Sequence, residues 1–189
     1  MTRCAWVPEN DALYCAYHDK EWGAQVHDDR KLFEFLILET FQAGLSWKTV
    51  LHKRENFRKA FANFNVKKVA AFNQQDEQRL LGNEGIIRNK LKIRAAISNA
   101  RAFLRVAEEY GSFDKYIWSF TNYKPVVNKW KNISEIPART ELSDKISSAL
   151  KKRGFKFVGS TVIYAHMQAT GMVNDHTTDC FRYKQVQVK

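Results

Sequence analysis

The sequence predicts an all-α protein. Apolar residues recur at helical spacing over most of its 189 residues, and residues suited to helix capping stand before these runs. No sustained stretch alternates apolar and polar residues as a half-buried strand would. The hydrophobic content of 44% is enough for a core. The length fits one domain, which we expect to cover residues 1–189.

The first half of the chain contains two predicted helices. Asp28 or Asp29 can cap one that runs to Glu39 through an almost continuous apolar segment. Ser46 can cap the second. Its apolar residues continue at helical spacing as Phe57, Phe61 and Phe64.

The second half contains the clearest helical pattern. Asn89 can cap this helix, whose apolar residues follow one stripe until Gly111 ends it in a left-handed conformation. Two further helices are predicted, through residues 142–150 and 161–170, ending at Gly154 and Gly171. The stretch between Pro125 and Pro137 is predicted to be a surface loop.

Charge points to a polyanionic partner. The chain carries a net charge of +11 and has a pI near 9.6. Nucleic acid is the commonest partner for such a surplus, although a basic, well-solvated surface is the alternative. No apolar run approaches the roughly 18 residues of a membrane span, and the N-terminus has no secretory pattern. We therefore expect a soluble, cytoplasmic monomer with reduced cysteines and no membrane partner.

Residues 74–94 have the layout of a helix-hairpin-helix. A short helix near 75–81 precedes a glycine-containing turn, and a second helix then begins with the cations Arg88, Lys90 and Lys92. Backbone N–H groups at such a turn and helix start can bind a phosphate. An ordinary helix–turn–helix connection is the alternative.

Metal-type ligands stand near both ends of the chain. His176 and Cys180 are four positions apart and share one face of a helical turn, while Cys4 and His18 could complete a tetrahedral set. Two thiolates and two imidazoles suit Zn²⁺, and a closed set of four is structural. The alternative is a buried cysteine with ordinary histidines. Four residues are assigned structural roles, namely Cys15, His27, His52 and His166.

Aromatic residues are unusually dense before position 48. Flat rings above and below would suit an unpaired base, and tyrosine hydroxyls would add hydrogen bonds. Core packing is the alternative, which we prefer for Trp118 and Trp130. The residues of the possible base pocket are Trp6, Tyr14, Tyr17, Trp22 and Trp47.

Glu39 is a carboxylate in an apolar segment. Its burial is unfavourable unless a cation or a hydrogen-bond donor meets it. It could therefore contact the amine of a base, or stabilise positive charge in a transition state. A salt bridge at a helix end is the alternative. The glycine-containing loop that follows could push Gln42 or Leu45 into a duplex.

These features together resemble the 3-methyladenine DNA glycosylase I family. The segments that carry the resemblance are Cys4-Ala-Trp6, YHDKEWG (17–23), LETFQAGLSWKTVLHKRENFRKAF (38–61), GIIRNKLKI (85–93), LKKRGFKFVGST (150–161) and GMVNDHTTDC (171–180). The resemblance implies a helix-hairpin-helix DNA glycosylase fold and removal of 3-methyladenine from alkylated double-stranded DNA, with the free base as product. It also implies one structural zinc that joins the N- and C-terminal segments.

The resemblance assigns roles to residues. The implied zinc ligands are Cys4, His18, His176 and Cys180. The implied base pocket contains Trp6, Tyr14, Tyr17, Trp22, Glu39 and Trp47, with Glu39 as the catalytic residue. The candidate DNA contacts are Gln42, Leu45, Arg88, Lys90 and Lys156. We expect a zinc lobe from residues 1–30 and 160–189, and a helical lobe from residues 31–159.

Two departures from the family pattern affect these expectations. Thr40 beside the carboxylate could trim the pocket, and the turn Glu84-Gly85-Ile86 lacks a second glycine. No acid downstream of the hairpin (Glu108, Glu109 or Asp114) has a context that supports a catalytic role. A zinc-stabilised DNA-damage binding module without catalysis is the main alternative function, and a zinc hydrolase is another.

Overall fold

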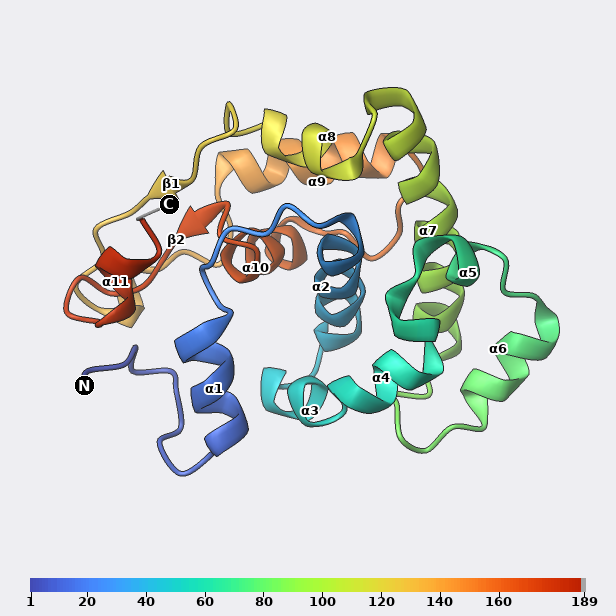
Figure 1. Ribbon diagram of the computed structural model, residues 1–189, viewed down its shortest axis with the longest axis horizontal. Coiled ribbons are helices and arrows are strands. Elements are labelled where there is room, and N and C mark those ends of the chain that lie inside the picture. Colours follow the sequence, from blue (N-terminus) through green and yellow to red (C-terminus); the bar gives the residue numbers. More distant parts are fainter. Residues whose placement is uncertain (188–189) are drawn as a thin grey trace.

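The structure, a computed structural model, describes residues 1–187. The helices α1 to α11 and the strands β1 and β2 are shown in Figure 1. The helices are α1 (Ala12–Lys20), α2 (Asp29–Gln42), α3 (Trp47–His52), α4 (Arg54–Ala60), α5 (Val66–Ala70), α6 (Gln74–Leu81), α7 (Lys90–Tyr110), α8 (Phe113–Ser119), α9 (Glu141–Lys152), α10 (Ser160–Ala169) and α11 (Arg182–Gln185). Short 3₁₀ turns cover Ala62–Phe64 and Ile133–Glu135.

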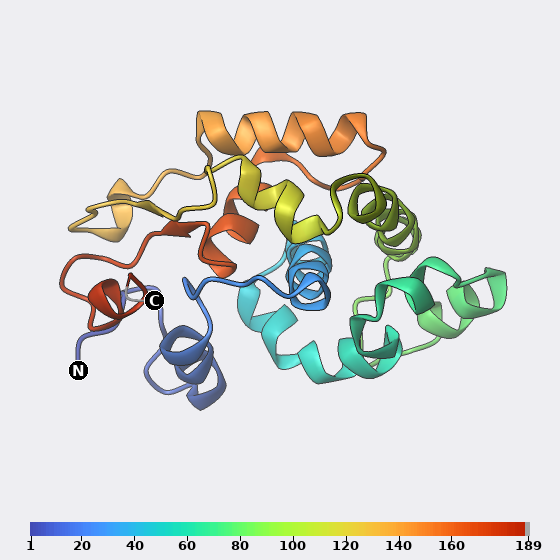
Figure 2. The same ribbon diagram turned by 45° about the horizontal axis from the view of Figure 1, so that its top comes forward.

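Helix α2 lies at the centre of the fold. It contacts α3, α7, α8 and α10, and Figures 1 and 2 show these helices around it. Ten consecutive residues of α2, from Leu32 to Phe41, are buried. A helix buried on all sides has an apolar sequence all round, which explains its near-continuous apolar run. Glu39 is one of the few charged groups within this buried segment.

The caps predicted from the sequence fix several helix ends. The side chains of Asp28, Ser46 and Asn89 accept hydrogen bonds from the first turns of α2, α3 and α7. Gly111 ends α7 with φ of 84°. Asp29 has a different role, because its carboxylate accepts from the N–H groups of Phe113 and Asp114 at the start of α8.

The prediction that one helix continues from Ser46 to Phe64 is wrong. The segment is divided into α3, α4 and a 3₁₀ turn, since Lys53 separates α3 from α4. Ala62, Asn63 and Phe64 then all have φ near +53°, which turns the chain. Phe57, Phe61 and Phe64 are nevertheless all fully buried. Helical spacing therefore predicted which side chains are buried, and missed the turn that brings them together.

The prediction of a wholly helical protein needs one correction. Strands β1 (Val126–Val127) and β2 (Val173–Asn174) form a two-stranded parallel sheet. Two residues per strand leave no alternating pattern for sequence analysis to detect. The pairing fixes the segment after α8 beside the segment that leads to His176.

The two ends of the described chain lie together. The N–H of Phe181 donates to the carbonyl oxygen of Thr2 at 3.0 Å, and Figure 1 shows the blue and red segments side by side. The predicted zinc lobe extends to residue 189, and residues 188 and 189 lie outside the described residues. Residues 1–187 contain no helix with the length and apolarity that a membrane crossing requires.

Candidate functional site

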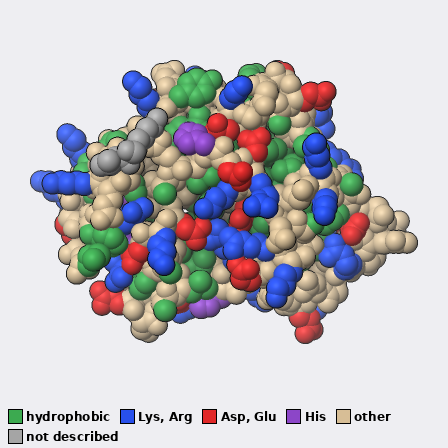
Figure 3. Space-filling view, viewed as in Figure 1, with side chains coloured by type: hydrophobic (Ala, Val, Ile, Leu, Met, Phe, Trp, Pro, Cys, Tyr) green, Lys and Arg blue, Asp and Glu red, His purple; other side chains and the backbone are tan. Residues whose placement is uncertain are grey.

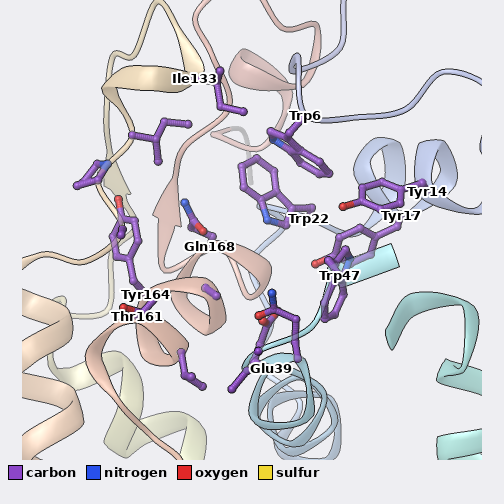
Figure 4. Close-up of a pocket in the computed structure, with 18 residues that line it drawn as sticks. Trp6, Tyr14, Tyr17, Trp22, Glu39, Trp47, Ile133, Thr161, Tyr164 and Gln168 are labelled. Carbon is purple, nitrogen blue, oxygen red and sulfur yellow. The ribbon is translucent and has the colours of Figure 1, made fainter. Parts of the chain in front are cut away.

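A cavity of about 630 Å³ brings together all six side chains that the sequence suggested for a base pocket. Its aromatic wall consists of Trp6, Tyr14, Tyr17, Trp22 and Trp47, with Glu39 beside it (Figure 4). The rings form a connected series. Trp6 and Trp22 meet edge to face at 4.8 Å between ring centroids, and Tyr17 and Trp47 are 5.2 Å apart. A cavity of this size and apolar character suits a flat organic ligand.

The Glu39 carboxyl is buried without a partner. Its residue is 4% exposed, and burial alone raises its pKa to about 8. No ion pair or hydrogen bond involves this carboxyl within residues 1–187. A buried acid of this kind is uncharged near neutral pH, and an approaching cation would favour its ionised form. The sequence-level alternative of a salt bridge at a helix end is therefore wrong.

A second polar group beside the cavity is also unpaired. The Trp47 indole Nε1 is buried and has no hydrogen-bond partner among the described residues. Tyr17 is buried against Trp47, and burial followed by the nearby Glu39 raises the pKa of its hydroxyl well above the usual value. Tyr17 therefore keeps its hydrogen and can act as a donor.

Thr40 does not trim the cavity. It is fully buried, and its hydroxyl donates to the carbonyl oxygen of Leu36 at 2.9 Å. Thr40 is absent from the residues that line the cavity. Residues adjacent on a helix point in directions about 100° apart, so a neighbour of Glu39 need not face the same space.

The opposite wall of the cavity was missed by sequence analysis. The segment predicted as a surface loop supplies part of it, and one face of α10 supplies the rest. The residues are Ile133, Ile136, Pro137 and Ala138 from the segment, with Thr161, Val162, Tyr164, Ala165 and Gln168 from α10. Figure 4 shows Tyr164 and Gln168 across the cavity from Trp47. The helical spacing of the α10 residues was the available signal, since they recur every three or four positions.

Asp175 holds the opposite wall together. This carboxylate is fully buried and accepts hydrogen bonds from four side chains. Two come from the segment after β1, Asn128 and Trp130, each at 2.7 Å. Two come from α10, Tyr164 at 2.6 Å and Gln168 at 2.8 Å. Four donors compensate the desolvation of a buried charge. Trp130 is thus partly buried and hydrogen-bonded, which corrects the expectation of plain core packing.

A cluster of four buried metal-type ligands lies behind the aromatic wall. Cys4, His18, His176 and Cys180 place their ligand atoms within 4.8 Å of one another. His176 Nδ1 lies 3.4 Å from Cys4 Sγ, and His18 Nε2 lies 3.5 Å from Cys180 Sγ. Tetrahedral bonds to zinc of about 2.3 Å from sulfur and 2.0–2.1 Å from nitrogen would separate these atoms by about 3.5 Å. The cluster could therefore hold a metal ion.

The outer nitrogens of both histidines have partners that orient the rings. His176 Nε2 lies 3.0 Å from the carbonyl oxygen of Trp22, so this nitrogen carries the hydrogen. His18 Nδ1 lies 2.8 Å from Asp19 Oδ1. Both rings thus direct their other nitrogen inward, as metal ligands do. A hydrogen bond with Cys4 holds the pKa of Cys180 well below its usual value, which favours a thiolate in the cluster.

The cluster and the aromatic wall share their contacts. The Trp22 ring lies 4.6 Å from the His176 ring, and the Trp6 ring lies 5.3 Å from that of His18. Gly23 permits this approach, because a Cβ there would lie 2.8 Å from His176 Nε2. Its φ of +78° also favours glycine. The cluster therefore supports the outer rings of the cavity.

Comparison with known proteins agrees with this arrangement. The family described as methyladenine glycosylase matches residues 6–183 of the chain. The chain belongs to this family. The match includes Trp6, Glu39, Trp47 and three of the four clustered ligands, while Cys4 lies just before it.

Members of this family are close relatives over almost the whole chain. DNA-3-methyladenine glycosylase 1 of Escherichia coli (strain K12) is 52% identical over 183 residues, which are 97% of each chain. A solved 3-methyladenine DNA glycosylase I from Staphylococcus aureus is 34% identical, with a TM-score of 0.93 over 100% of this chain and 98% of its own. A variant of such an enzyme, solved in complex with 3-methyladenine, matches with a TM-score of 0.93 at 34% identity over 100% and 99% of the two chains.

The region predicted to be a helix-hairpin-helix comprises α6, a turn and the start of α7. Helices α6 and α7 pack together across a turn that contains Gly85. The N–H groups of Gly85 and Ile86 bond to the side chain and carbonyl of Asn83, so they do not face outward as free donors. Lys53 Nζ binds the carbonyls of Glu84 and Gly85. Neither of these two N–H groups is therefore free to bind a phosphate in the way that the sequence predicted for this turn.

Lys92 is not available to bind phosphate. It is 7% exposed, and burial lowers its pKa. Its ammonium donates to the carbonyl oxygen of Phe41 at 2.9 Å and to that of Ala43, at the C-terminal end of α2. A cation is favourable at this end of a helix. Lys92 thus joins the start of α7 to the helix that carries Glu39.

The candidate DNA contacts occupy three places. Gln42 lines the cavity, and its amide donates to the carbonyl of Leu45, whose side chain is 41% exposed. Arg88 and Lys90 are exposed at the start of α7, although Arg88 lies 3.6 Å from Glu84. The structure separates Lys156 from these residues. The backbone N–H of Lys156 donates to the Asn99 side chain. Asn99 is nine positions beyond Lys90 and therefore lies about 14 Å further along α7.

Other titratable groups have structural partners, as the sequence suggested. His27, His52 and His166 bond to Asp114, Asp11 and the Leu32 carbonyl, and the Cys15 thiol donates to the Pro8 carbonyl. Glu109 pairs with Arg153.

On the face seen in Figure 3, cationic and acidic side chains are interspersed, so the surplus positive charge forms no uniform patch there.

Proposed function

We propose that this protein is a monofunctional DNA glycosylase that hydrolyses the N-glycosidic bond of 3-methyladenine in alkylated duplex DNA. The observation that carries the proposal is a buried, unpaired carboxyl within an aromatic cavity. Core packing alone would not leave Glu39 without a partner there, since an unpaired buried carboxyl is destabilising. The names of the relatives as glycosylases support catalysis over a purely binding module.

Selection of the damaged base follows from charge. Methylation at N3 makes the purine in DNA cationic, and a cationic ring gains more from stacking on indoles than a neutral one. The Glu39 carboxyl has a pKa of about 8 without a ligand. An extruded cationic base beside it would favour the carboxylate, which then attracts the amine of that base. Neutral adenine offers no such stabilisation of the charge.

Departure of the base needs little acid assistance. The electron pair of the N-glycosidic bond moves to the cationic purine and neutralises it, and positive charge develops on the sugar. The Glu39 carboxylate stabilises that charge through its electric field. Water then adds to the sugar carbon and releases a proton to solvent. No lysine among residues 1–187 lines the cavity, which supports hydrolysis to an abasic site without a Schiff base.

Engagement of the duplex is proposed at the loop between α2 and α3. Leu45 is the exposed tip of this loop, and the Gln42 amide holds the Leu45 carbonyl. Gly44, with φ of +82°, permits the turn. Leu45 would fill the space left by the extruded base, with Gln42 beside it. Arg88 and Lys90 would then bind phosphates at the hairpin.

The metal is proposed to be one structural Zn²⁺ per chain. Two thiols, two imidazoles and their spacing suit zinc, and four protein ligands leave no open position for a reacting water. The ion would therefore support the fold and the aromatic wall, which disfavours a zinc hydrolase. We further propose that the chain acts as a monomer and a single domain, in which the zinc lobe and the helical lobe both contribute residues to the cavity.

The test is chromatography of bases released from methylated duplex DNA during incubation with the protein. The proposal predicts free 3-methyladenine in amounts well above the protein added. If the protein binds the DNA but releases no free base, a binding module without catalysis would be favoured. Glu39→Gln is expected to release the base more slowly, and wild-type turnover in that variant would remove Glu39 from the mechanism.

A further inference from the structure

Lys92 is a buried lysine whose charge the proposed reaction does not use. It is 7% exposed, whereas lysines in proteins are almost always exposed unless they are paired. No carboxylate among residues 1–187 forms an ion pair with it, and burial lowers its pKa. Burial of an ammonium group without an acidic partner is unfavourable, and it persists only where hydrogen bonds compensate it.

Lys92 provides hydrogen bonds that the end of α2 lacks. The last four carbonyl groups of a helix have no partner within it, and α2 has no basic residue in its last turn. The Lys92 ammonium donates to the carbonyl oxygens of Phe41 and Ala43. Between them, the carbonyl oxygen of Gln42 accepts from the N–H of Leu45 at 2.7 Å. The end of α2 is thus completed by a cation that belongs to α7.

The loop between α2 and α3 has one hydrogen bond to a distant part of the chain. Residues 44–46 are exposed, and Leu45 among them is the tip proposed to enter the duplex. Within residues 1–187, the other hydrogen bonds of this loop reach no further than α2 and α3. The bond from Lys92 to the Ala43 carbonyl is the one that reaches α7. The position of the loop relative to α7 therefore depends on Lys92.

Lys92 also belongs to the start of α7, where phosphate binding is proposed. The side chain of Asn89 caps this helix by accepting from the Lys92 N–H at 3.1 Å. Lys90, two positions before Lys92, is exposed and is one of the proposed phosphate contacts. A single residue thus joins the two structures that are proposed to meet the duplex, which are the start of α7 and the loop that carries Leu45.

We propose that Lys92 is a positioning residue for extrusion of the damaged base. It holds the loop at a fixed distance from the start of α7, so that phosphate binding by α7 places Leu45 against the base stack. The proposal rests on the proposed function, because it explains how the loop and the start of α7 act together. Lys92 is not among the residues that line the cavity, so it acts through Leu45 and not on the base.

The test compares Lys92→Met with Arg101→Met. Methionine keeps a long, flexible apolar side chain and removes both the charge and the hydrogen-bond donors. Arg101 is the matched control, because it is also a cation of α7 that donates to two backbone carbonyls. These belong to Ala70 and Phe72, at the end of α5, and Arg101 does not line the cavity. Three quantities are measured for each variant: Tm, Kd for free 3-methyladenine, and the single-turnover rate constant of base release from methylated duplex DNA.

Lys92→Met is expected to reduce the single-turnover rate constant about tenfold, because a displaced loop extrudes the base less often. Its Kd for free 3-methyladenine should stay within about twofold of wild type, since a free base needs no extrusion. Arg101→Met should change neither quantity. A wild-type rate constant in Lys92→Met would overturn the proposal, and so would an equal loss of free-base affinity.

A double-mutant cycle with Leu45→Ala separates positioning of the loop from general destabilisation. If Lys92 acts through Leu45, the double variant should release the base as slowly as the slower single variant, within about twofold. Independent losses that multiply would overturn the proposal. Lys92→Gln is a second variant, which keeps an amide donor without the charge. If neither Lys92→Met nor Lys92→Gln folds, Lys92 is a structural residue and the proposal is wrong.

Failure of the proposed function has a different signature. Wild-type protein would then release no 3-methyladenine, yet unstacking of the duplex can be followed without catalysis. The probe is 2-aminopurine placed beside an abasic-site analogue, because its fluorescence increases when it leaves the base stack. Lys92→Met should give a smaller increase than wild type, and Arg101→Met should give the same increase as wild type. Equal increases for all three proteins would overturn the proposal.

Discussion

The two walls of the cavity are held in place in different ways. The aromatic wall is built from rings that contact one another and rest on the buried cysteine–histidine cluster. The opposite wall is built from a segment and a helix face that share one buried carboxylate, Asp175. One wall thus depends on a metal-type site, and the other on a hydrogen-bond network. Each dependence can be broken by a single substitution.

The largest effect is expected from the cluster behind the aromatic wall. Cys4→Ser removes a ligand that joins the N-terminal segment to His176 and Cys180, so we expect loss of several kcal/mol of stability and of bound metal. Removal of metal by a chelator should lower helical content in the same way. Circular dichroism during heating, together with metal analysis, measures both.

Cys15→Ser is the matched control for this substitution. Its thiol lies outside the cluster and bonds to a backbone carbonyl, so little change is expected. Equal melting of the two variants would show that the aromatic wall does not depend on the cluster. A fold that survives chelation while base release is lost would instead support a catalytic metal.

The next effect concerns the opposite wall. Asp175→Asn keeps the shape of the side chain but replaces one acceptor oxygen with an amino group that faces donors. At least one of its four partners then lacks an acceptor, so destabilisation by about 2–4 kcal/mol is expected. Affinity for free 3-methyladenine should fall too, because Tyr164 and Gln168 lose their orientation. Chemical denaturation and fluorescence titration measure these effects.

Asp144→Asn is a suitable comparison, since the Asp144 side chain is 43% exposed and forms an ion pair with Arg139 alone among residues 1–187. Its stability should stay within about 0.5 kcal/mol of wild type. If Asp175→Asn behaved in the same way, the network would not hold the wall.

A smaller and pH-dependent effect is expected at Glu39, between the walls. Its folded pKa of about 8 lies above its ordinary value of 4.5, so the folded state retains a proton that the unfolded state loses. Wild-type stability therefore decreases as pH rises from about 4.5 to about 8, and Glu39→Gln lacks this decrease. Between pH 5 and pH 7, the free energy of unfolding of the variant should rise by about 2 kcal/mol relative to that of wild type. Denaturation curves at several pH values measure the gap, and a constant gap would contradict the burial of an unpaired carboxyl.

The sequence predicted the aromatic wall better than the opposite wall, for a physical reason. Rings and metal-type ligands have recognisable side chains, and Trp6, Trp22 and Glu39 lie in short distinctive segments. Asp175 has no such signal, because its four partners are spread from Asn128 to Gln168 and meet only in the folded chain. The stretch near Ile133 has the polar, proline-bracketed composition of a loop, which does not reveal the cavity beneath it.

Helices were predicted where local chemistry decides their ends. Caps at Asp28, Ser46 and Asn89 and the glycine at position 111 gave correct boundaries. The helical spacing of Phe57, Phe61 and Phe64 does not reveal the break at Lys53 or the left-handed residues near Asn63, because all three rings are buried whether or not the helix continues. Lys92 was misjudged for the same reason: its charge is visible in the sequence, and its burial against α2 is not.

In the proposed function, both walls hold one methylated purine against Glu39. A crystal structure of the protein with 3-methyladenine tests it most directly. We expect the purine to stack against Trp47, with its amine within hydrogen-bond distance of the Glu39 carboxyl and with Gln168 still bound to Asp175. A base found outside this cavity, or within it but away from Glu39, would contradict the claim.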